Sequence, residues 1–214
     1  MTSRSNLPAT ALGRRLNAAQ ADRRAQLIAA ARALAGEGGY EAVTISALCE
    51  HACVARATFY HYFGSKDHVL GEAIVQWGRE RMAELRRRPP TGRTPYERTV
   101  GTLRWVLDAV LRDSKLIEAH VQSMVSPDLG VGSTQRELAS LVTGYLEVGL
   151  GPAAASVDVA ALSMVLSHVF FSSLVNMTAG RASAEAVFED LTLAARLVLE
   201  PSSRTAKQQQ RATV

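Results

Sequence analysis

The stretch from Val43 to Leu70 constrains the fold of this chain more than any other part of it. Thr44 is a favourable N-cap, because its hydroxyl can accept a hydrogen bond from a free backbone amide one turn into a helix. After it, apolar residues recur at helical spacing, at Ile45, Leu48 and Ala52. That spacing ends near residue 53, and a second helical segment follows from about residue 55 to residue 63. The stretch therefore predicts two short helices joined by a tight turn.

The second of these helices is expected to have an inward face and a polar outer face. Phe59 and Phe63 are four residues apart and should both point into the core. The other positions carry cationic, hydroxyl-bearing, small or aromatic side chains, at Arg56, Ala57, Thr58, Tyr60, His61 and Tyr62. Such side chains suit contact with phosphates and base edges in a DNA major groove. Gly64 is expected to end this helix, and Ser65 is expected to cap the next one.

The run TISALCEHACVARATFYHYFGSKDHVL, residues 44–70, resembles the helix-turn-helix of TetR-family transcriptional regulators. The pattern T-F-Y-x-x-F-x-S-K at residues 58–66 carries most of that resemblance, which covers about residues 20–70; beyond them only the layout agrees. Two positions depart from the family pattern, because Cys53 stands where Gly is usual and Ala55 stands where Ser is usual. The first costs backbone freedom, since Gly adopts unusual φ angles most readily. The second removes a helix cap, but neither changes the apolar register.

The resemblance implies roles for individual residues. Thr44, Tyr60 and Lys66 would hold DNA phosphates, while Arg56, Ala57, Thr58 and His61 would face the groove, and Tyr62 completes the predicted DNA-contacting set. Ala57 can offer only apolar contact, for example with a thymine methyl group. One module reads a half-site that is too short to be specific. The resemblance therefore implies a homodimer on a near-palindromic operator in double-stranded DNA.

Positive charge is concentrated at the beginning of the chain. The 214 residues carry a formal net charge of +4 and a sequence pI of about 9.4. Residues 1–32 hold six arginines and one acidic residue, whereas the remainder holds 18 basic and 19 acidic residues. The excess lies next to the helix-turn-helix, as expected of a nucleic-acid-binding protein. Residues 1–18 are predicted to form a basic arm that adds phosphate contacts; a basic tail without a partner is the alternative.

Helical periodicity without an alternating strand pattern predicts an all-α protein of about nine helices. The composition, 47% hydrophobic and 21% charged, is typical of a soluble globular protein. We expect an N-terminal three-helix helix-turn-helix DNA-binding domain followed by a C-terminal helical ligand-binding and dimerisation domain. The predicted divisions are a flexible basic arm at 1–18, a DNA-binding domain at 19–65, an effector-binding and dimerisation domain at 66–200 and a disordered tail at 201–214.

Local signals set the expected helix boundaries. Glycines at positions 36, 38 and 39 are expected to end a first helix that begins near Ala19. Thr94 should cap a later helix that has Pro95 in its first position. The helices beyond the motif are expected at about 66–87, 95–112, 114–125, 133–150, 156–179 and 183–200.

The last two of these helices are the candidates for dimerisation. The helix at 156–179 is apolar around much of its circumference, so it must be buried on more than one side. The predicted interface residues are Leu162, Val165, Val169, Phe188, Leu191, Ala195 and Leu199. The family layout implies a four-helix interface built from two copies of this pair. The alternative is that both helices simply fill the core of a monomer.

Aromatic, methionine and histidine side chains are the candidates for effector binding. The predicted lining is Trp77, Trp105, His120, Met124, Tyr145, His168 and Phe171. Each of these residues is alternatively an ordinary core residue. The family resemblance implies an effector that weakens DNA binding by favouring a different spacing of the two DNA-binding heads. The shortage of charge in the C-terminal helices indicates a small hydrophobic effector such as a lipid, an acyl-CoA or a sterol-like molecule.

Other classes of function have little support in the sequence. It contains no G-x-S-x-G motif, no phosphate-cradling glycine loop after a strand and no paired carboxylates in an apolar setting, so neither an enzyme nor a cofactor is expected. Cys49 and Cys53 lie four residues apart, a spacing that suits neither a relaxed disulfide nor a complete zinc site, so no metal is expected. Redox or metal sensing by these cysteines remains one alternative. An interaction protein with a vestigial helix-turn-helix is another.

No membrane association is expected. The most apolar stretch, residues 157–177, includes too many polar residues for a bilayer span, at Asp158, Ser163, Ser167, His168, Ser172, Ser173 and Asn176. Residues 1–19 lack the apolar region of a signal peptide. The sequence therefore predicts a cytoplasmic protein.

Overall fold

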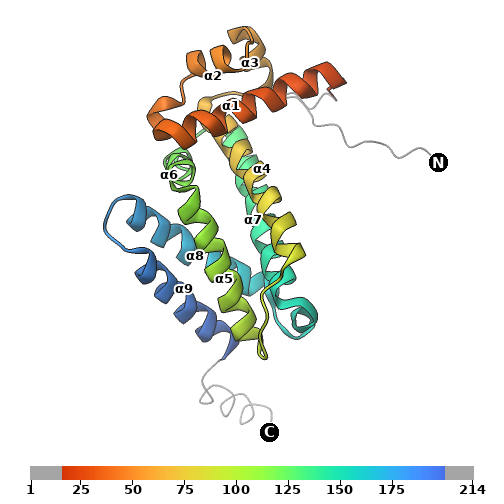
Figure 1. The fold of residues 1–214 in the computed structure, drawn as a ribbon, viewed down its shortest axis with the longest axis vertical. Coiled ribbons are helices and arrows are strands. Elements are labelled where there is room, and N and C mark those ends of the chain that lie inside the picture. The colour runs from red at the N-terminus through yellow and green to blue at the C-terminus, as the bar shows by residue number, and fades with distance from the viewer. Residues whose placement is uncertain (1–15, 201–214) are drawn as a thin grey trace, which may run out of the picture. The chain divides into compact units, whose positions relative to one another are not determined.

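The protein is described by a computed structural model in which residues 16–200 are placed; residues 1–15 of the predicted arm and the tail from residue 201 lie outside the described residues. Within the described range the chain forms nine α-helices and one short 3-10 helix, without a β-strand (Figure 1). They are α1 (Ala18–Ala42), α2 (Ile45–His51), α3 (Arg56–Tyr62), α4 (Lys66–Arg87), α5 (Pro95–Arg112), α6 (Ser114–Ser123), α7 (Leu129–Leu150), η1 (Gly151–Ser156), α8 (Val159–Thr178) and α9 (Ala184–Leu199). The prediction of an all-α fold is confirmed.

The helices pack into two compact units. The first contains α1–α3, α4 as far as Gly78, α6, and α7 as far as Leu138. The second contains the remaining parts of α4 and α7 together with α5, η1, α8 and α9. Two long helices therefore contribute to both units. For this reason the packing units do not follow the division placed at residue 65 from the sequence motif.

Helix α1 is longer than the sequence indicated at both ends. Asn17 caps it through a capping box, in which the Gln20 N–H donates to Asn17 Oδ1 at 2.9 Å and the Asn17 N–H donates to Gln20 Oε1 at 3.0 Å. Leu16, just before the cap, is 2% exposed. The predicted stop at the first glycine is wrong, because the helix breaks only at Gly39, where φ is 69° and ψ is −160°. A side chain would be strained at that φ.

Most other helix boundaries fall within a few residues of those predicted. The bounds of α4 and α5 agree with the sequence signals, and the Thr94 hydroxyl accepts from the Glu97 N–H at 3.1 Å as a cap. Helix α7 begins four residues earlier than predicted. The reason is Asp128, whose Oδ1 accepts a hydrogen bond from the Gly130 N–H at 2.7 Å and so caps α7.

Apolar side chains from four helices form the core of the second unit. They are Leu103 and Leu107 of α5, Leu146 and Leu150 of α7, Leu162 and Leu166 of α8, and Val187, Leu191, Ala194 and Ala195 of α9. Helix α9 lies beside both α5 and α8 (Figure 1). On the surface, the Arg104 guanidinium of α5 lies 3.5 Å from the centre of the Phe188 ring on α9. The small side chains of Ala194 and Ala195 allow α9 to pack closely in the core of this unit.

Helix α8 leaves much apolar surface exposed. Two stretches, Leu129–Ser156 and Val159–Thr178, are long and apolar enough to cross a membrane when judged by length and composition alone. In each of them only 22% of the apolar window is buried within the protein. The mean hydropathy of the α8 window is 1.6. A soluble protein seldom leaves so apolar a helix uncovered, so α8 is a candidate for contact with another molecule.

Candidate nucleic-acid interface and effector residues

Helix α3 presents a polar face away from the core. Phe59 and Phe63 are fully buried, as predicted, and their ring centres lie 5.8 Å apart. Arg56, Ala57, Tyr60 and His61 are exposed and Thr58 is half-buried. The Tyr60 side chain is 55% exposed, although its ring touches Phe59 edge to face at 5.4 Å. The helix therefore offers a row of exposed polar and aromatic side chains on a firmly anchored backbone.

Tyr62 does not belong to that exposed face. Its side chain is only 3% exposed, so the expectation that it lies on the outer surface is wrong. The reason is helical geometry, because position 62 follows Phe59 by three residues and points to the same side of the helix. The Tyr62 ring lies within 6.5 Å of the Phe63 ring. It contributes to the small core that holds α3.

Helix α2 and the turn after it agree with the sequence signals. The Thr44 hydroxyl accepts a hydrogen bond from the Ala47 N–H at 3.1 Å, which confirms it as the N-cap. Cys53 lies in the turn with φ at 50°, in the left-handed region where the family usually has Gly. Ala55 begins α3 with the backbone angles of a cap but makes no side-chain hydrogen bond. Both departures from the family pattern thus affect local stability: Cys53 has an unfavourable φ angle, and α3 lacks a side-chain cap.

Lys66 has a structural role in this region. Its Nζ lies 3.6 Å from the centre of the Tyr40 ring and donates to the Tyr40 carbonyl oxygen at 3.3 Å. The Tyr40 hydroxyl donates to Asp67 Oδ1 at 2.8 Å. Burial and this carboxylate raise the pKa of Tyr40 to about 12. These contacts hold the end of α1 against the start of α4.

An ion pair that the sequence did not reveal also fixes the helix-turn-helix. Arg24 of α1 pairs with Glu72 of α4 at 2.6 Å, and its guanidinium lies 5.3 Å from the centre of the Phe63 ring. Both charged side chains are largely buried, with 15% and 18% exposed. The residues are 48 positions apart, so no local pattern could indicate the pair. It attaches α1 to α4, the helix that follows α3.

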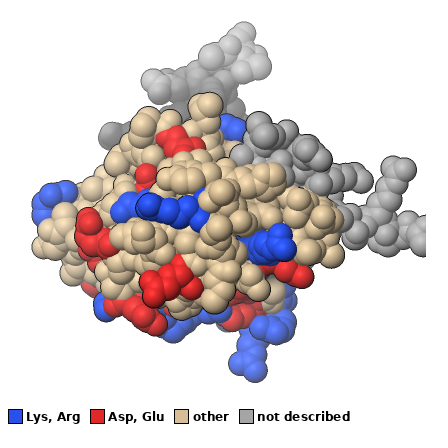
Figure 2. All heavy atoms as spheres, turned by 90° about the horizontal axis from the view of Figure 1, so that it is seen from above, with Lys and Arg blue, Asp and Glu red and all other residues tan. Residues whose placement is uncertain are grey.

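Charge on the described surface is mixed. In Figure 2 the lysine and arginine side chains stand apart among uncharged surface, with acidic side chains between them. The described residues on this face therefore do not form a continuous basic patch. Three of the six early arginines, Arg4, Arg14 and Arg15, belong to residues 1–15, which lie outside the described part of the chain. The predicted basic arm thus stays a prediction.

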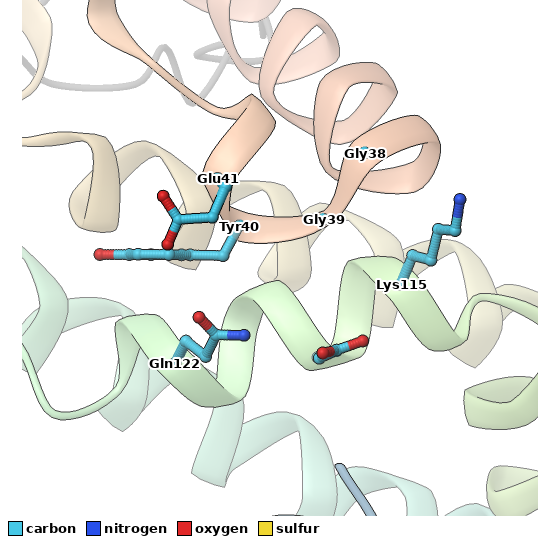
Figure 3. Close-up of a pocket in the computed structure, with 7 residues that line it drawn as sticks. Gly38, Gly39, Tyr40, Glu41, Lys115 and Gln122 are labelled. Atoms are coloured by element: carbon cyan, nitrogen blue, oxygen red, sulfur yellow. The ribbon is translucent and has the colours of Figure 1, made fainter. Parts of the chain in front are cut away.

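A shallow surface pocket of about 240 Å³ lies where α6 meets the kink in α1 (Figure 3). It is lined by Gly38, Gly39, Tyr40, Glu41, Lys115, Glu118 and Gln122. Lys115 Nζ donates to the Glu37 carbonyl oxygen at 2.6 Å. Since its lining includes two acidic side chains and a lysine, this pocket does not suit a hydrophobic effector.

The predicted effector residues divide between the two units. In the first unit Trp77 is buried and its Nε1 donates to Asp113 Oδ2 at 2.7 Å, while Met124 is half-buried at the end of α6. In the second unit the rings of Trp105 and Tyr145 lie 6.0 Å apart. His168 and Phe171 are exposed on α8. Within one unit, therefore, only Trp105 and Tyr145 of this predicted set show a ring contact.

His120 is the most unusual of the predicted effector residues. Its side chain is 7% exposed on α6, and neither ring nitrogen has a hydrogen-bond partner among the described residues. Burial lowers the pKa of His120 to about 4, so the ring is neutral at neutral pH. Each buried polar atom left unpaired costs roughly 1–3 kcal/mol. The ring therefore offers one donor and one acceptor to any polar group that reaches it.

The predicted dimer residues lie partly in the core of their own chain. Leu162, Leu191 and Ala195 are buried in the second unit, and Val165, Val169, Phe188 and Leu199 are half-buried. The apolar side chains exposed on the same helices are different ones, Met164 at 59% and Phe171 at 37% on α8, and Leu193 at 55% and Leu197 at 66% on α9. We call these four the α8–α9 apolar face. On each helix the two residues are spaced by four or seven positions, so they lie on the same side of it. Periodicity alone could not tell which side of each helix faces outward.

The cysteines show no sign of a metal centre in the described part of the chain. Cys49 is buried and Cys53 is exposed, and both are free. Burial raises the pKa of the Cys49 thiol, although Arg56 opposes this. Among residues 16–200 no group of three or more potential metal ligands comes together.

Comparison with known proteins agrees with this geometry. Residues 27–73 match the family model for bacterial regulatory proteins of the tetR family, and residues 92–198 match that for a tetracyclin repressor-like C-terminal domain. The chain is 34% identical over 186 residues to the HTH-type transcriptional repressor KstR of Rhodococcus jostii (strain RHA1), a match that covers 87% of each chain.

Solved structures show the same fold. A TetR transcriptional regulator from Rhodococcus sp. RHA1 matches with a TM-score of 0.70 and 22% identity, over 86% of this chain and 99% of that one. Thermus thermophilus FadR, a TetR-family repressor in complex with lauroyl-CoA, matches with a TM-score of 0.63 and 22% identity, over 84% and 94%. Because both halves of the sequence match the family and a relative above 30% identity spans most of the chain, this protein belongs to the TetR family of bacterial transcriptional regulators.

Proposed function

We propose that this chain is a repressor that binds a near-palindromic operator as a homodimer and leaves it when a small hydrophobic effector binds. The exposed face of α3 carries the proposal, because Arg56, Tyr60 and His61 project from a helix whose opposite side is fully buried. Such a helix, preceded by a second short helix and a tight turn, suits the major groove. As a regulator of bacterial transcription, the protein works in the cytoplasm.

On the operator, the side chains of α3 divide by chemistry. Arg56 and His61 donate hydrogen bonds to base edges or phosphates, and Ala57 offers a methyl contact. Tyr60 and Thr44 hold phosphates, because a hydroxyl on a fixed backbone positions the helix without reading sequence. Lys66 keeps N–H donors beyond the one used by Tyr40, so it can hold a phosphate as well.

The homodimer forms through the α8–α9 apolar face. Met164 and Phe171 on α8 and Leu193 and Leu197 on α9 are exposed in the single chain. Pairing two copies of this face about a two-fold axis would remove the exposed apolar surface of both chains from water. A buried apolar side chain contributes about 1.5–3 kcal/mol. The half-buried neighbours Val165 and Val169 extend the same surface.

The effector is hydrophobic and carries at least one oxygen. The apolar character of the C-terminal helices supports the first part, and the unpaired His120 ring supports the second. A carbonyl or hydroxyl oxygen on the effector accepts a hydrogen bond from the His120 N–H. The fold admits such molecules, because the related fold of Thermus thermophilus FadR holds lauroyl-CoA. To release DNA, the effector must bind the DNA-incompetent state more tightly, and coupling of roughly 1–3 kcal/mol is typical.

Fluorescence anisotropy on labelled DNA from directly upstream of the protein's own gene tests the proposal. Tight binding that weakens steeply with salt is expected for the wild-type protein. Tyr60→Ala should weaken binding strongly while the dimer stays intact, and Cys49→Ala, which changes a buried thiol in α2, should not. Wild-type affinity in Tyr60→Ala would show that the recognition helix is misplaced.

The same assay addresses the effector. Lauroyl-CoA, a free fatty acid and a sterol ketone are added in turn to the protein–DNA complex. Release by one class names the effector chemistry, and His120→Leu should then raise the concentration needed for release. If no member of the panel releases the DNA, the effector belongs to none of these three classes. The proposal of operator binding would be unaffected by that result.

A further inference from the structure

The loop between α6 and α7 contacts the Gly64–Ser65 turn that follows α3. Asp128 in this loop lies close to Ser65, whose hydroxyl stabilises the ionised carboxylate, and its Oδ1 accepts a hydrogen bond from the Gly130 N–H at 2.7 Å. A Cβ atom on Gly64 would lie 2.8 Å from Asp128 Oδ2. The carboxylate therefore lies directly against the backbone that follows α3, and a side chain at position 64 would displace it. All four residues belong to the first packing unit.

A second contact reinforces the first. Gly130 lies so close to the His68 ring that a side chain at 130 would overlap it. The His68 ring packs edge to face on Phe63 at 5.3 Å, and its Nε2 lies 3.9 Å from Glu72 Oε1. Glu72 is the residue that pairs with Arg24 of α1. A chain of close contacts thus runs from the α6–α7 loop through the start of α4 to α1.

Asp128 is charged in this setting. Burial alone would raise its pKa, but the Ser65 hydroxyl, the Gly130 amide and His68 together lower it. The carboxylate is therefore ionised at neutral pH. Hydrogen bonds to an ionised acceptor are about twice as strong as neutral ones. The charge strengthens the contact with the Gly64–Ser65 turn, but the geometry of the contact needs only two polar atoms at position 128.

We propose that Asp128 is a positioning residue for DNA recognition. Its carboxylate holds the Gly64–Ser65 turn, and through it α3, in the orientation that enters the major groove. Asp128 lies within the match to the C-terminal domain, whereas Gly64 and Ser65 lie within the match to the DNA-binding domain. The bridge therefore connects the part of the chain that carries the effector residues to the part that reads DNA. This role rests on the proposed function of α3 as the recognition helix.

The bridge also gives the effector a route to the DNA-binding helix. His120 lies on α6 only eight residues before Asp128. The end of α6 is tied to α7, because Gln135 Nε2 donates to the Met124 carbonyl oxygen at 3.0 Å. A movement of α6 caused by an effector at His120 therefore moves the loop that carries Asp128. Losing the contact with Ser65 frees the turn and lowers operator affinity.

Two substitutions separate the bridge, that is, the contact of Asp128 with the Gly64–Ser65 turn, from the structural role of Asp128 as the cap of α7. Asp128→Ser keeps a cap, because a serine hydroxyl can accept from the Gly130 N–H, but it lacks the second oxygen that reaches Ser65. Asp128→Asn keeps two polar atoms, since its amide can cap α7 and donate to the Ser65 oxygen. Asp108→Ser, at an exposed position on α5, is the matched control for loss of one carboxylate.

Operator affinity, its salt dependence and the melting temperature are measured for the full-length chain. Asp128→Ser should bind operator DNA about three- to thirtyfold more weakly, the range typical of residues that transmit coupling. Its salt slope should equal that of the wild type, since no phosphate contact is lost. Asp128→Asn and Asp108→Ser should bind within about twofold of the wild type. All three variants should melt within a few degrees of it.

The sign of the effect is itself diagnostic. Removing an acidic group near DNA ordinarily strengthens binding, because it reduces repulsion from the phosphates. A loss of affinity in Asp128→Ser therefore points to lost positioning. Hydrogen exchange gives a readout beyond affinity: amides of residues 56–65 should exchange faster in Asp128→Ser, with no change in α9.

The outcomes distinguish the two proposals. If Asp128→Ser binds like the wild type while Tyr60→Ala loses binding, Asp128 is not a positioning residue and the recognition helix stands. If Asp128→Asn loses as much affinity as Asp128→Ser, the charge acts rather than the bridging geometry, and the positioning role is wrong. If Tyr60→Ala binds like the wild type, the proposed function of α3 has failed before the bridge is tested.

Discussion

At the scale of single residues, Cys53 occupies a backbone conformation that is costly for any residue with a side chain. Its φ of 50° lies in the left-handed region, where a Cβ atom costs about 1–2 kcal/mol. Part of that cost is offset by the lower entropy of a non-glycine residue in the unfolded chain. We expect Cys53→Gly to stabilise the protein by roughly 0.5–1 kcal/mol. Thermal melting checks this, with Cys53→Ala, which keeps the Cβ, as the control that should not gain.

His120 makes the stability of the protein depend on pH. The folded state keeps the ring neutral, with a pKa of about 4, whereas the unfolded chain binds a proton at the ordinary value of 6.5. As far as this ring is concerned, the protein is therefore most stable above pH 6.5, and its stability falls as the pH drops toward 4. Between pH 7 and pH 5 the loss is about 2 kcal/mol.

The variant His120→Leu should not show this part of the decline. Urea unfolding of both proteins at pH 7, 6 and 5 measures the difference. Acidic groups with a lowered pKa, such as Asp128, also make the free energy of unfolding fall as the pH falls. Both proteins contain these groups, so their effect cancels in the comparison. Parallel slopes for wild type and variant would mean that His120 is solvated or paired in solution.

At the scale of elements, α3 lacks a side-chain N-cap, although the backbone at Ala55 has the conformation of an N-cap residue. Ala55 has φ −72° and ψ 152°, which are the angles of an N-cap, but it has no side chain to accept a hydrogen bond. We expect Ala55→Ser to stabilise the protein by about 1 kcal/mol, because the hydroxyl would satisfy a free amide of α3. Ala55→Val, which adds bulk without an acceptor, should give no gain. Differential scanning calorimetry distinguishes the two.

At the scale of the whole molecule, the α8–α9 apolar face sets the oligomeric state. Leu193→Glu or Leu197→Glu places a charge in the proposed interface, where it would be buried without a partner. Analytical ultracentrifugation should show a monomer whose helical content is unchanged, and operator binding should fall with it. Leu111→Glu, at a 42% exposed leucine of α5, should remain dimeric. A dimeric Leu197→Glu variant would place the interface elsewhere.

Much of the fold was predictable because it is encoded locally. The caps at Thr44 and Thr94, the buried pair Phe59 and Phe63 and the bounds of α4 and α5 all follow from residues a few positions apart. Where the local signal was ambiguous, it failed. Gly36 and Gly38 did not end α1, because a helix tolerates glycine at a modest cost when packing supports it, whereas Gly39, the last of the three glycines predicted to end it, does break the helix.

The sequence by itself determined the class of this protein: the apolar spacing, the caps and the T-F-Y-x-x-F-x-S-K pattern fix an all-α chain with a helix-turn-helix, because those signals act within one or two helical turns. Only the tertiary structure decided which apolar side chains face inward. Leu162 and Leu191 were expected in the dimer interface but are buried in their own unit, while Met164 and Leu197 are left exposed. Tertiary packing alone also brought Asp128 against Ser65 and Arg24 against Glu72. These pairs are separated by many residues, and no local periodicity records which distant side chains will meet.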